Sequence, residues 1–167
     1  MREALMSIAA ERRGPETEAV RPRPLRSIAV GGLIVGMIDM AYAIAVYSPR
    51  APLRIPQAIA TGLLGRRSFT LGVTSIALGT VCHFVIAFGA AAVYTLASRR
   101  LTILIRRPVL CGLVYGALVY VFMHWVVIPL SAVPPGHSPL IYKVCEFVEH
   151  WFGVGLPIAL AARRYAS

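Results

Sequence analysis

Charged side chains are scarce in this sequence, where Asp, Glu, Lys and Arg together make up 14% of the 167 residues. Soluble domains carry about 25% charged residues, so the shortage excludes an ordinary water-soluble fold. Acidic residues are the scarcest, with 7 Asp and Glu against 17 Lys and Arg. The net charge of +10 could suggest nucleic acid, but the arginines stand in pairs at the ends of apolar segments, as membrane anchors do. We therefore predict membrane lipid as a partner, and no nucleic acid.

Cysteine is also rare, and sequence motifs of soluble enzymes are missing. The three cysteines fall inside apolar segments without Cys-x-x-Cys spacing, which indicates neither a disulfide framework nor a zinc knuckle. The chain has no phosphate-binding loop, dinucleotide fingerprint or nucleophile elbow, because its Gly-rich stretches lie inside apolar segments. The sequence thus predicts no catalytic residues and favours a protein that is not an enzyme.

Long apolar runs are what the sequence has instead. Four segments are hydrophobic all round, and each reaches the roughly 20 residues that a bilayer core of about 30 Å requires. We expect these helices over residues 28–47, 71–97, 109–130 and 141–162. The predicted fold class is all-α, a four-helix transmembrane bundle. A short interfacial helix is expected between helices 1 and 2, in the proline-punctuated connection 48–68.

The distribution of charge predicts two regions and an orientation. Residues 1–27 mix six arginines with four glutamates and three prolines, which indicates a disordered basic cytoplasmic tail, and residues 28–167 form the transmembrane domain. With the N-terminus inside, 12 arginines lie on the cytoplasmic side, against five Lys and Arg on the other. Because positive charge near helix ends resists translocation, we predict a multi-pass protein of the bacterial inner (plasma) membrane with cytoplasmic N- and C-termini.

Six ionisable side chains interrupt the apolar segments, and each is a functional candidate because an unpartnered charge in a bilayer costs several kcal/mol. They are Asp39, His83, His124, Glu146, Glu149 and His150. Every segment contributes at least one, in a layer between the outer interface and the midplane. Helical spacing places them on the faces that carry small residues, so we expect the polar faces to converge. Examples are Gly32 and Gly36 with Asp39, and Gly112 and Gly116 with His124.

The chemistry of this set predicts a metal site, since imidazole and carboxylate suit a transition metal. Glu-x-x-x-His also places Glu146 and His150 one helical turn apart. We assign His83, His124, Glu146 and His150 as metal ligands, with a transition metal of unknown identity as the candidate cofactor. Asp39, Glu149 and Tyr120 are assigned to a proton-handling or polar network.

Three alternatives to the metal site stay open. The same groups are able to relay protons or to act as a proton-responsive switch, and a proton path would require a homo-oligomer. A haem between His83 and His124 is the second alternative. The third is a structural or partner-binding membrane subunit, in which the polar residues only fix helix packing.

Four short segments also carry a resemblance to known proteins. They read IATGLLG at 59–65, HFVIAF at 83–88, VVIPLS at 126–131 and GVGLPIA at 153–159. Together they resemble a group of small, uncharacterised bacterial inner-membrane proteins and, more remotely, the YagU-like family. The resemblance covers about residues 28 to 162 and implies a four-helix inner-membrane topology without an established biochemical activity.

Overall fold

The computed structural model describes residues 23–136 and 138–166, and the regular structure in these ranges is helical. Four long helices dominate it, two of them continued by π-helical turns. They are α2 (Pro24–Tyr47), α4 (Val73–Ser98), α6 (Pro108–Phe122) with η2 (Met123–Val127), and α7 (Leu140–Glu149) with η3 (His150–Gly155) and α8 (Leu156–Tyr165). Each of the four is long and apolar enough to cross a bilayer. The predicted four-helix transmembrane bundle is confirmed, and the chain is a multi-pass membrane protein.

The first helix begins at Pro24, earlier than the expected residue 28. Proline suits the first turn of a helix, because the N–H that it lacks has no partner there in any case. Ser27, in this first turn, is buried and its hydroxyl lies 2.8 Å from that of Thr95 in α4. Residues 24–27 of the predicted tail are therefore helical, and its residues 1–22 lie outside the described residues.

The predicted short helix between the first two spans is also confirmed. It is α3 (Arg54–Leu64), followed by the 3-10 turn η1 (Gly65–Thr70). The helix buries Ile55 and Ala60 and packs closely on α4 at Gly79, where any Cβ would overlap the carbonyl oxygen of Pro56. A further short helix, α5 (Ile103–Arg106), joins the second and third spans and was not expected from the sequence.

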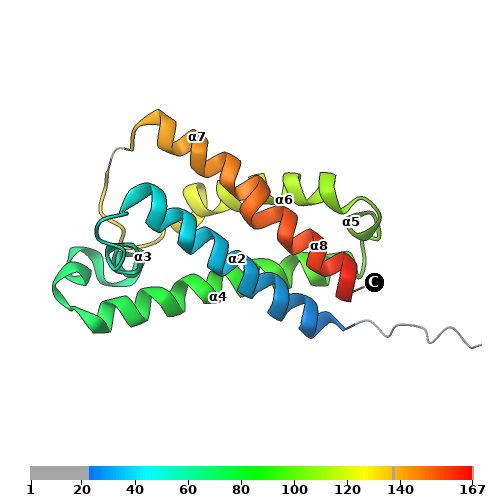
Figure 1. Cartoon of the computed structure of the whole chain (residues 1–167), viewed down its shortest axis with the longest axis horizontal. Helices are drawn as coiled ribbons and strands as arrows, with labels where there is room; N and C mark the ends of the chain where they lie inside the picture. The colour runs from blue at the N-terminus through cyan, green and yellow to red at the C-terminus, as the bar shows by residue number, and fades with distance from the viewer. Residues whose placement is uncertain (1–22, 137, 167) are drawn as a thin grey trace, which may run out of the picture.

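The two ends of the bundle differ (Figure 1). The first and last described residues lie at the same end, where the backbone N–H of Arg23 donates to the carbonyl of Tyr165 at 2.6 Å. Helix α3 and the turn before α7 lie at the opposite end. The buried core consists of Val35, Ala87, Ala91, Tyr94, Val154, Ile158, Ala159 and Ala162. Because this core gathers toward the end with the termini, the half of the bundle near α3 is left open for a cavity.

Small residues set the closest helix contacts, as membrane helices require in the absence of a hydrophobic force between them. Gly32 and Gly36 of α2 lie against the rings of Phe88 and Phe84 in α4. Across the bundle, Gly116 of α6 lies against the carbonyl of His150. Large apolar side chains on the outer faces of all four spans are exposed, so these faces contact lipid.

Candidate functional site

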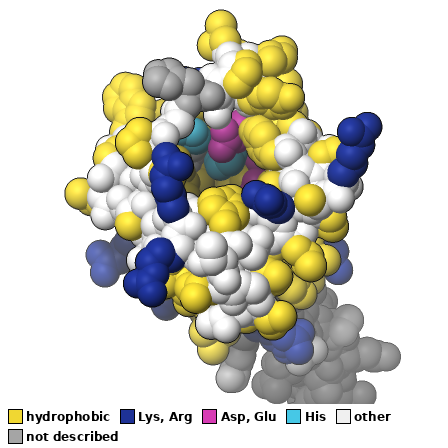
Figure 2. Space-filling view, turned by 90° about the vertical axis from the view of Figure 1, so that its left-hand side faces the viewer, with side chains coloured by type: hydrophobic (Ala, Val, Ile, Leu, Met, Phe, Trp, Pro, Cys, Tyr) yellow, Lys and Arg dark blue, Asp and Glu magenta, His cyan; other side chains and the backbone are white. Residues whose placement is uncertain are grey.

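A cavity of about 670 Å³ opens at the α3 end of the bundle. All five polar residues of the expected layer line it: Asp39, His83, His124, Glu146 and His150. Most other lining residues are apolar, including Val35, Ile86 and Val119. Figure 2 looks at the molecule from this end and shows histidine and acidic side chains inside a hollow that hydrophobic and basic side chains surround. The four spans thus bring their polar groups to one place.

His83 and Asp39 form the first of three histidine–carboxylate pairs. The ring is buried, and its Nε2 donates to the carbonyl of Gly36 at 2.9 Å. A carbonyl only accepts, so the hydrogen of the neutral ring is on Nε2 and Nδ1 carries a lone pair. That Nδ1 lies 3.8 Å from Oδ2 of Asp39. A lone pair and a carboxylate repel each other, so a cation or a proton between them would stabilise the pair.

His150 and Glu149 form the second pair, deeper in the protein. Nδ1 of His150 donates to the carbonyl of Glu146 at 2.9 Å and lies 3.1 Å from Oε2 of Glu149. The side chain of Glu149 is only 6% exposed, yet neither of its oxygens receives a hydrogen bond within the described residues. One ligand atom each from Asp39, Glu149 and His150 lies within 4.8 Å of the other two. An ionised carboxylate in this position is costly unless a cation, a hydrogen-bond donor or a bound proton compensates it.

His124 and Glu146 form the third pair, nearer the cavity mouth. Nδ1 of His124 donates to the carbonyl of Tyr120 at 3.1 Å, and Nε2 lies 3.6 Å from Oε2 of Glu146. The ring of Tyr120 stacks on that of His124 with 4.1 Å between their centroids. The hydroxyl of Tyr120 also donates to the carbonyl of Lys143 at 3.4 Å, which links α6 to α7. Tyr120 therefore positions His124 rather than lining the cavity.

The structure groups the predicted metal ligands and polar-network residues differently from the assignment that we made from the sequence. Of the four predicted metal ligands, only His150 lies in the compact three-residue group. Asp39 and Glu149, which we assigned to the polar network, supply its two carboxylates. His83 reaches this group through Asp39, whereas His124 and Glu146 form a separate pair.

Sequence reasoning missed two aromatic residues of the cavity wall, Tyr42 and Tyr47. Their rings meet edge to face at 6.2 Å, and the buried hydroxyl of Tyr42 has no hydrogen-bond partner in the described chain. Tyr42 follows Asp39 by three positions, so it lies on the same helix face. This three-residue spacing from Asp39 could have predicted from the sequence that Tyr42 lines the cavity.

Both π-helical segments lie at histidines of the cavity. η2 (Met123–Val127) contains His124, and η3 (His150–Gly155) begins at His150. A π-helical turn widens the backbone and is less favourable than an α-helical one, and such turns are frequent at functional sites. Each π-helical segment therefore contains a histidine that we assigned from the sequence as a metal ligand.

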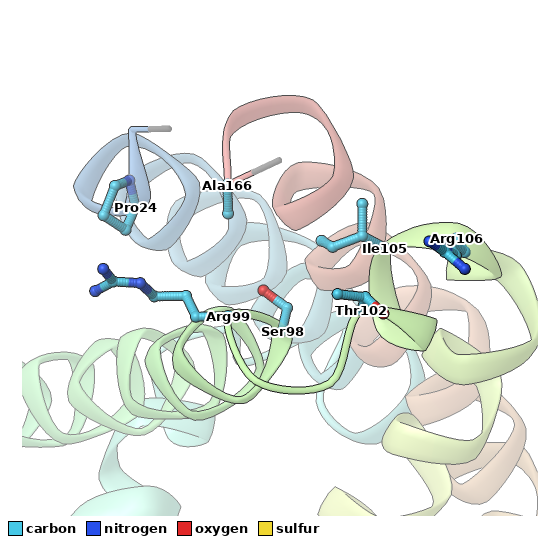
Figure 3. Close-up of a pocket in the computed structure, with 7 residues that line it drawn as sticks. All are labelled: Pro24, Ser98, Arg99, Thr102, Ile105, Arg106 and Ala166. Atoms are coloured by element: carbon cyan, nitrogen blue, oxygen red, sulfur yellow. The ribbon is translucent and has the colours of Figure 1, made fainter. Parts of the chain in front are cut away.

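A second cavity, of about 660 Å³, lies at the end with the termini (Figure 3). Its lining includes Arg99, Arg106, Ser98 and Thr102, but neither histidine nor a carboxylate among the described residues. These arginines follow the end of a membrane span, α4, as anchoring arginines of membrane helices do.

Comparison of the chain with protein-family models, curated proteins and solved structures finds no match.

Proposed function

We propose that this membrane protein binds a transition-metal ion at Asp39, Glu149 and His150. The observation that carries the proposal is the carboxylate of Glu149, which is buried in the bundle without a hydrogen bond in the described residues. An ionised group in such a place is costly unless a cation or a hydrogen-bond donor compensates it. A divalent ion held by both carboxylates would neutralise them, and the neutral imidazole would complete a set of three ligands.

The surroundings of the three ligands support a metal site. Each histidine of the cavity uses one ring nitrogen on a backbone carbonyl, which fixes the tautomer, as in metal sites whose ligand orientation is set by such bonds. The free Nδ1 of His83 faces Asp39 and is therefore able to approach an ion that Asp39 holds. Three protein ligands would also leave a coordination position of the ion free for a further ligand, as in catalytic zinc sites.

Proton-responsive switching is a second candidate function, and the three histidine–carboxylate pairs favour it. Their nitrogen–oxygen distances are 3.1, 3.6 and 3.8 Å, so protonation of each imidazole would give an ion pair that replaces the metal as the compensating charge. A purely structural subunit is the remaining alternative, in which the same groups only hold the helices in register.

Metal analysis of the detergent-purified protein tests the proposal. We expect about one equivalent of a transition metal in wild type and its loss in Glu149→Gln, because an amide removes the charge but keeps the size of the side chain. Glu146→Gln is the matched control, since Glu146 lies outside the three-residue group and its variant should keep the metal. A wild type that takes up no Mn, Fe, Co, Ni, Cu or Zn on titration would overturn the metal site.

We also propose that the protein lies in a bacterial inner membrane. The resemblance to small bacterial inner-membrane proteins and the excess of arginine at the end with the termini support an inner-membrane protein with cytoplasmic termini. In this orientation the cavity opens on the opposite side of the membrane. Assembly into a homo-oligomer stays a prediction that size measurement of the purified protein would test.

A further inference from the structure

The cavity is much larger than a metal site requires. A volume of about 670 Å³ falls in the range of roughly 300 to 1,000 Å³ that small-molecule sites occupy, whereas an ion needs only its ligands around it. The wall is mainly aliphatic, with Met40, Val81, Val85, Met123 and Val127 among its residues. Such a lining suits an organic molecule with an apolar body.

The cavity wall also includes exposed side chains of a membrane span, α4. Helices α4 and α6 both line it, but the contacts that join them directly lie toward the termini, where the hydroxyl of Tyr115 donates to the carbonyl of Ala90 at 2.7 Å. Farther along α4, Val81 and Val85 line the cavity and are 60% and 64% exposed. Because these two residues are exposed on a membrane span, this part of the wall is where a molecule dissolved in the membrane would enter.

The charge of the lining selects a cation. Asp39 and Glu146 contribute carboxylates, and the described lining contains neither lysine nor arginine. Glu146 lies outside the three-residue metal group, and the neutral ring of His124 turns a nitrogen without hydrogen toward it. Tyr42 and Tyr47 line the same cavity as Glu146, and their rings meet at 6.2 Å. A carboxylate beside aromatic rings is the arrangement that recognises organic ammonium groups.

We propose that the cavity binds a lipophilic organic ammonium ion that enters from the bilayer. The ammonium group pairs with Glu146 beside the rings of Tyr42 and Tyr47, and the apolar body lies along Val81 and Val85 of α4. This site uses a carboxylate that the metal group does not use, so it stands independently of the proposed metal function.

Binding of decyltrimethylammonium to the protein in lipid nanodiscs tests the inference. Equilibrium dialysis should show saturable binding to protein-containing nanodiscs above the partition into empty ones. Decyl sulfate, which has the same chain and the opposite charge, should show no saturable excess. Glu146→Gln should weaken binding of the ammonium ion at least tenfold, because the amide keeps the shape of the site and removes its charge.

Two further variants separate this site from the metal site and from a loss of folding. Glu149→Gln should bind decyltrimethylammonium within threefold of wild type, and Tyr47→Leu should weaken it three- to tenfold while thermal unfolding stays close to wild type. Equal binding of the sulfate, an unchanged affinity in Glu146→Gln, or an equal loss in both glutamate variants would each overturn the ammonium site. Metal content measured on the same samples shows separately whether the proposed metal function holds.

Discussion

The two ring nitrogens of His150 have different surroundings, and this difference gives the residue two separable roles. Nδ1 donates to the carbonyl of Glu146, four residues earlier in the same helix, and so holds the ring in place. Nε2 then carries the lone pair that a metal ion would need, whereas it is Nδ1 that lies 3.1 Å from Oε2 of Glu149. A glutamine side chain is able to keep a hydrogen bond to the backbone but is a poor metal ligand. His150 therefore offers a substitution that distinguishes a ligand from a packing residue.

We predict that His150→Gln and His150→Ala lose bound metal to the same extent, and that both lower the thermal unfolding temperature similarly, since both lose the stabilisation that a bound ion confers. Metal content and thermal unfolding measured side by side provide the check, with His124→Gln as the control that keeps its metal. A structural network predicts a different order, in which Gln retains the stability of wild type and Ala loses about 1 to 3 kcal/mol through unpaired buried groups. That order, together with metal-free wild type, would refute the ligand role.

At the scale of the helical elements, apolar length made the four spans predictable, because a bilayer imposes a minimum length on any apolar helix. Spacing of three and four residues likewise indicated which face of each helix turns inward, as Gly36 and Asp39 of α2 illustrate. The π-helical turns η2 and η3 were not predictable, since they depend on how His124 and His150 pack in the finished bundle. For the same reason the sequence did not show that Glu149, rather than Glu146, lies beside Asp39 and His150.

The contact between α6 and η3 provides a prediction at this scale. A Cβ at Gly116 would overlap the carbonyl of His150, the first residue of η3, so Gly116→Ala has to push the two elements apart. We expect a loss of about 1 to 3 kcal/mol of stability from overpacking, together with weaker metal binding because His150 shifts. Gly89→Ala is the matched control, because a Cβ there meets nothing within 4 Å and alanine favours a helix. Similar unfolding temperatures for the two variants would show that the α6–η3 contact is not close.

In the whole molecule, the core and the cavity with its carboxylates lie in opposite halves of the bundle. The core and the hydrogen bond between Ser27 and Thr95 close the half near the termini, whereas the cavity and its carboxylates occupy the half near α3. Arg99 and Arg106 lie beside the second cavity, at the end with the termini. The charge bias of the sequence indicated that the two ends differ. The cavity could not be predicted from the sequence, because side chains of five segments form it.

Orientation in the membrane is the prediction that belongs to the whole molecule. The described chain carries eight arginines at the end with the termini and five Lys and Arg at the end with α3, so the first end should stay in the cytoplasm. Reporter fusions after Arg100 and at the C-terminus should both give the cytoplasmic signal, and an insertion after Arg67 should give the periplasmic one. The arginines near α3 make the insertion the stricter test, although the guanidinium of Arg54 lies 5.6 Å from the ring of Phe69, a position suited to the interface. A cytoplasmic signal after Arg67 with periplasmic termini would reverse the orientation, and the cavity would then open to the cytoplasm and draw its ligands from there.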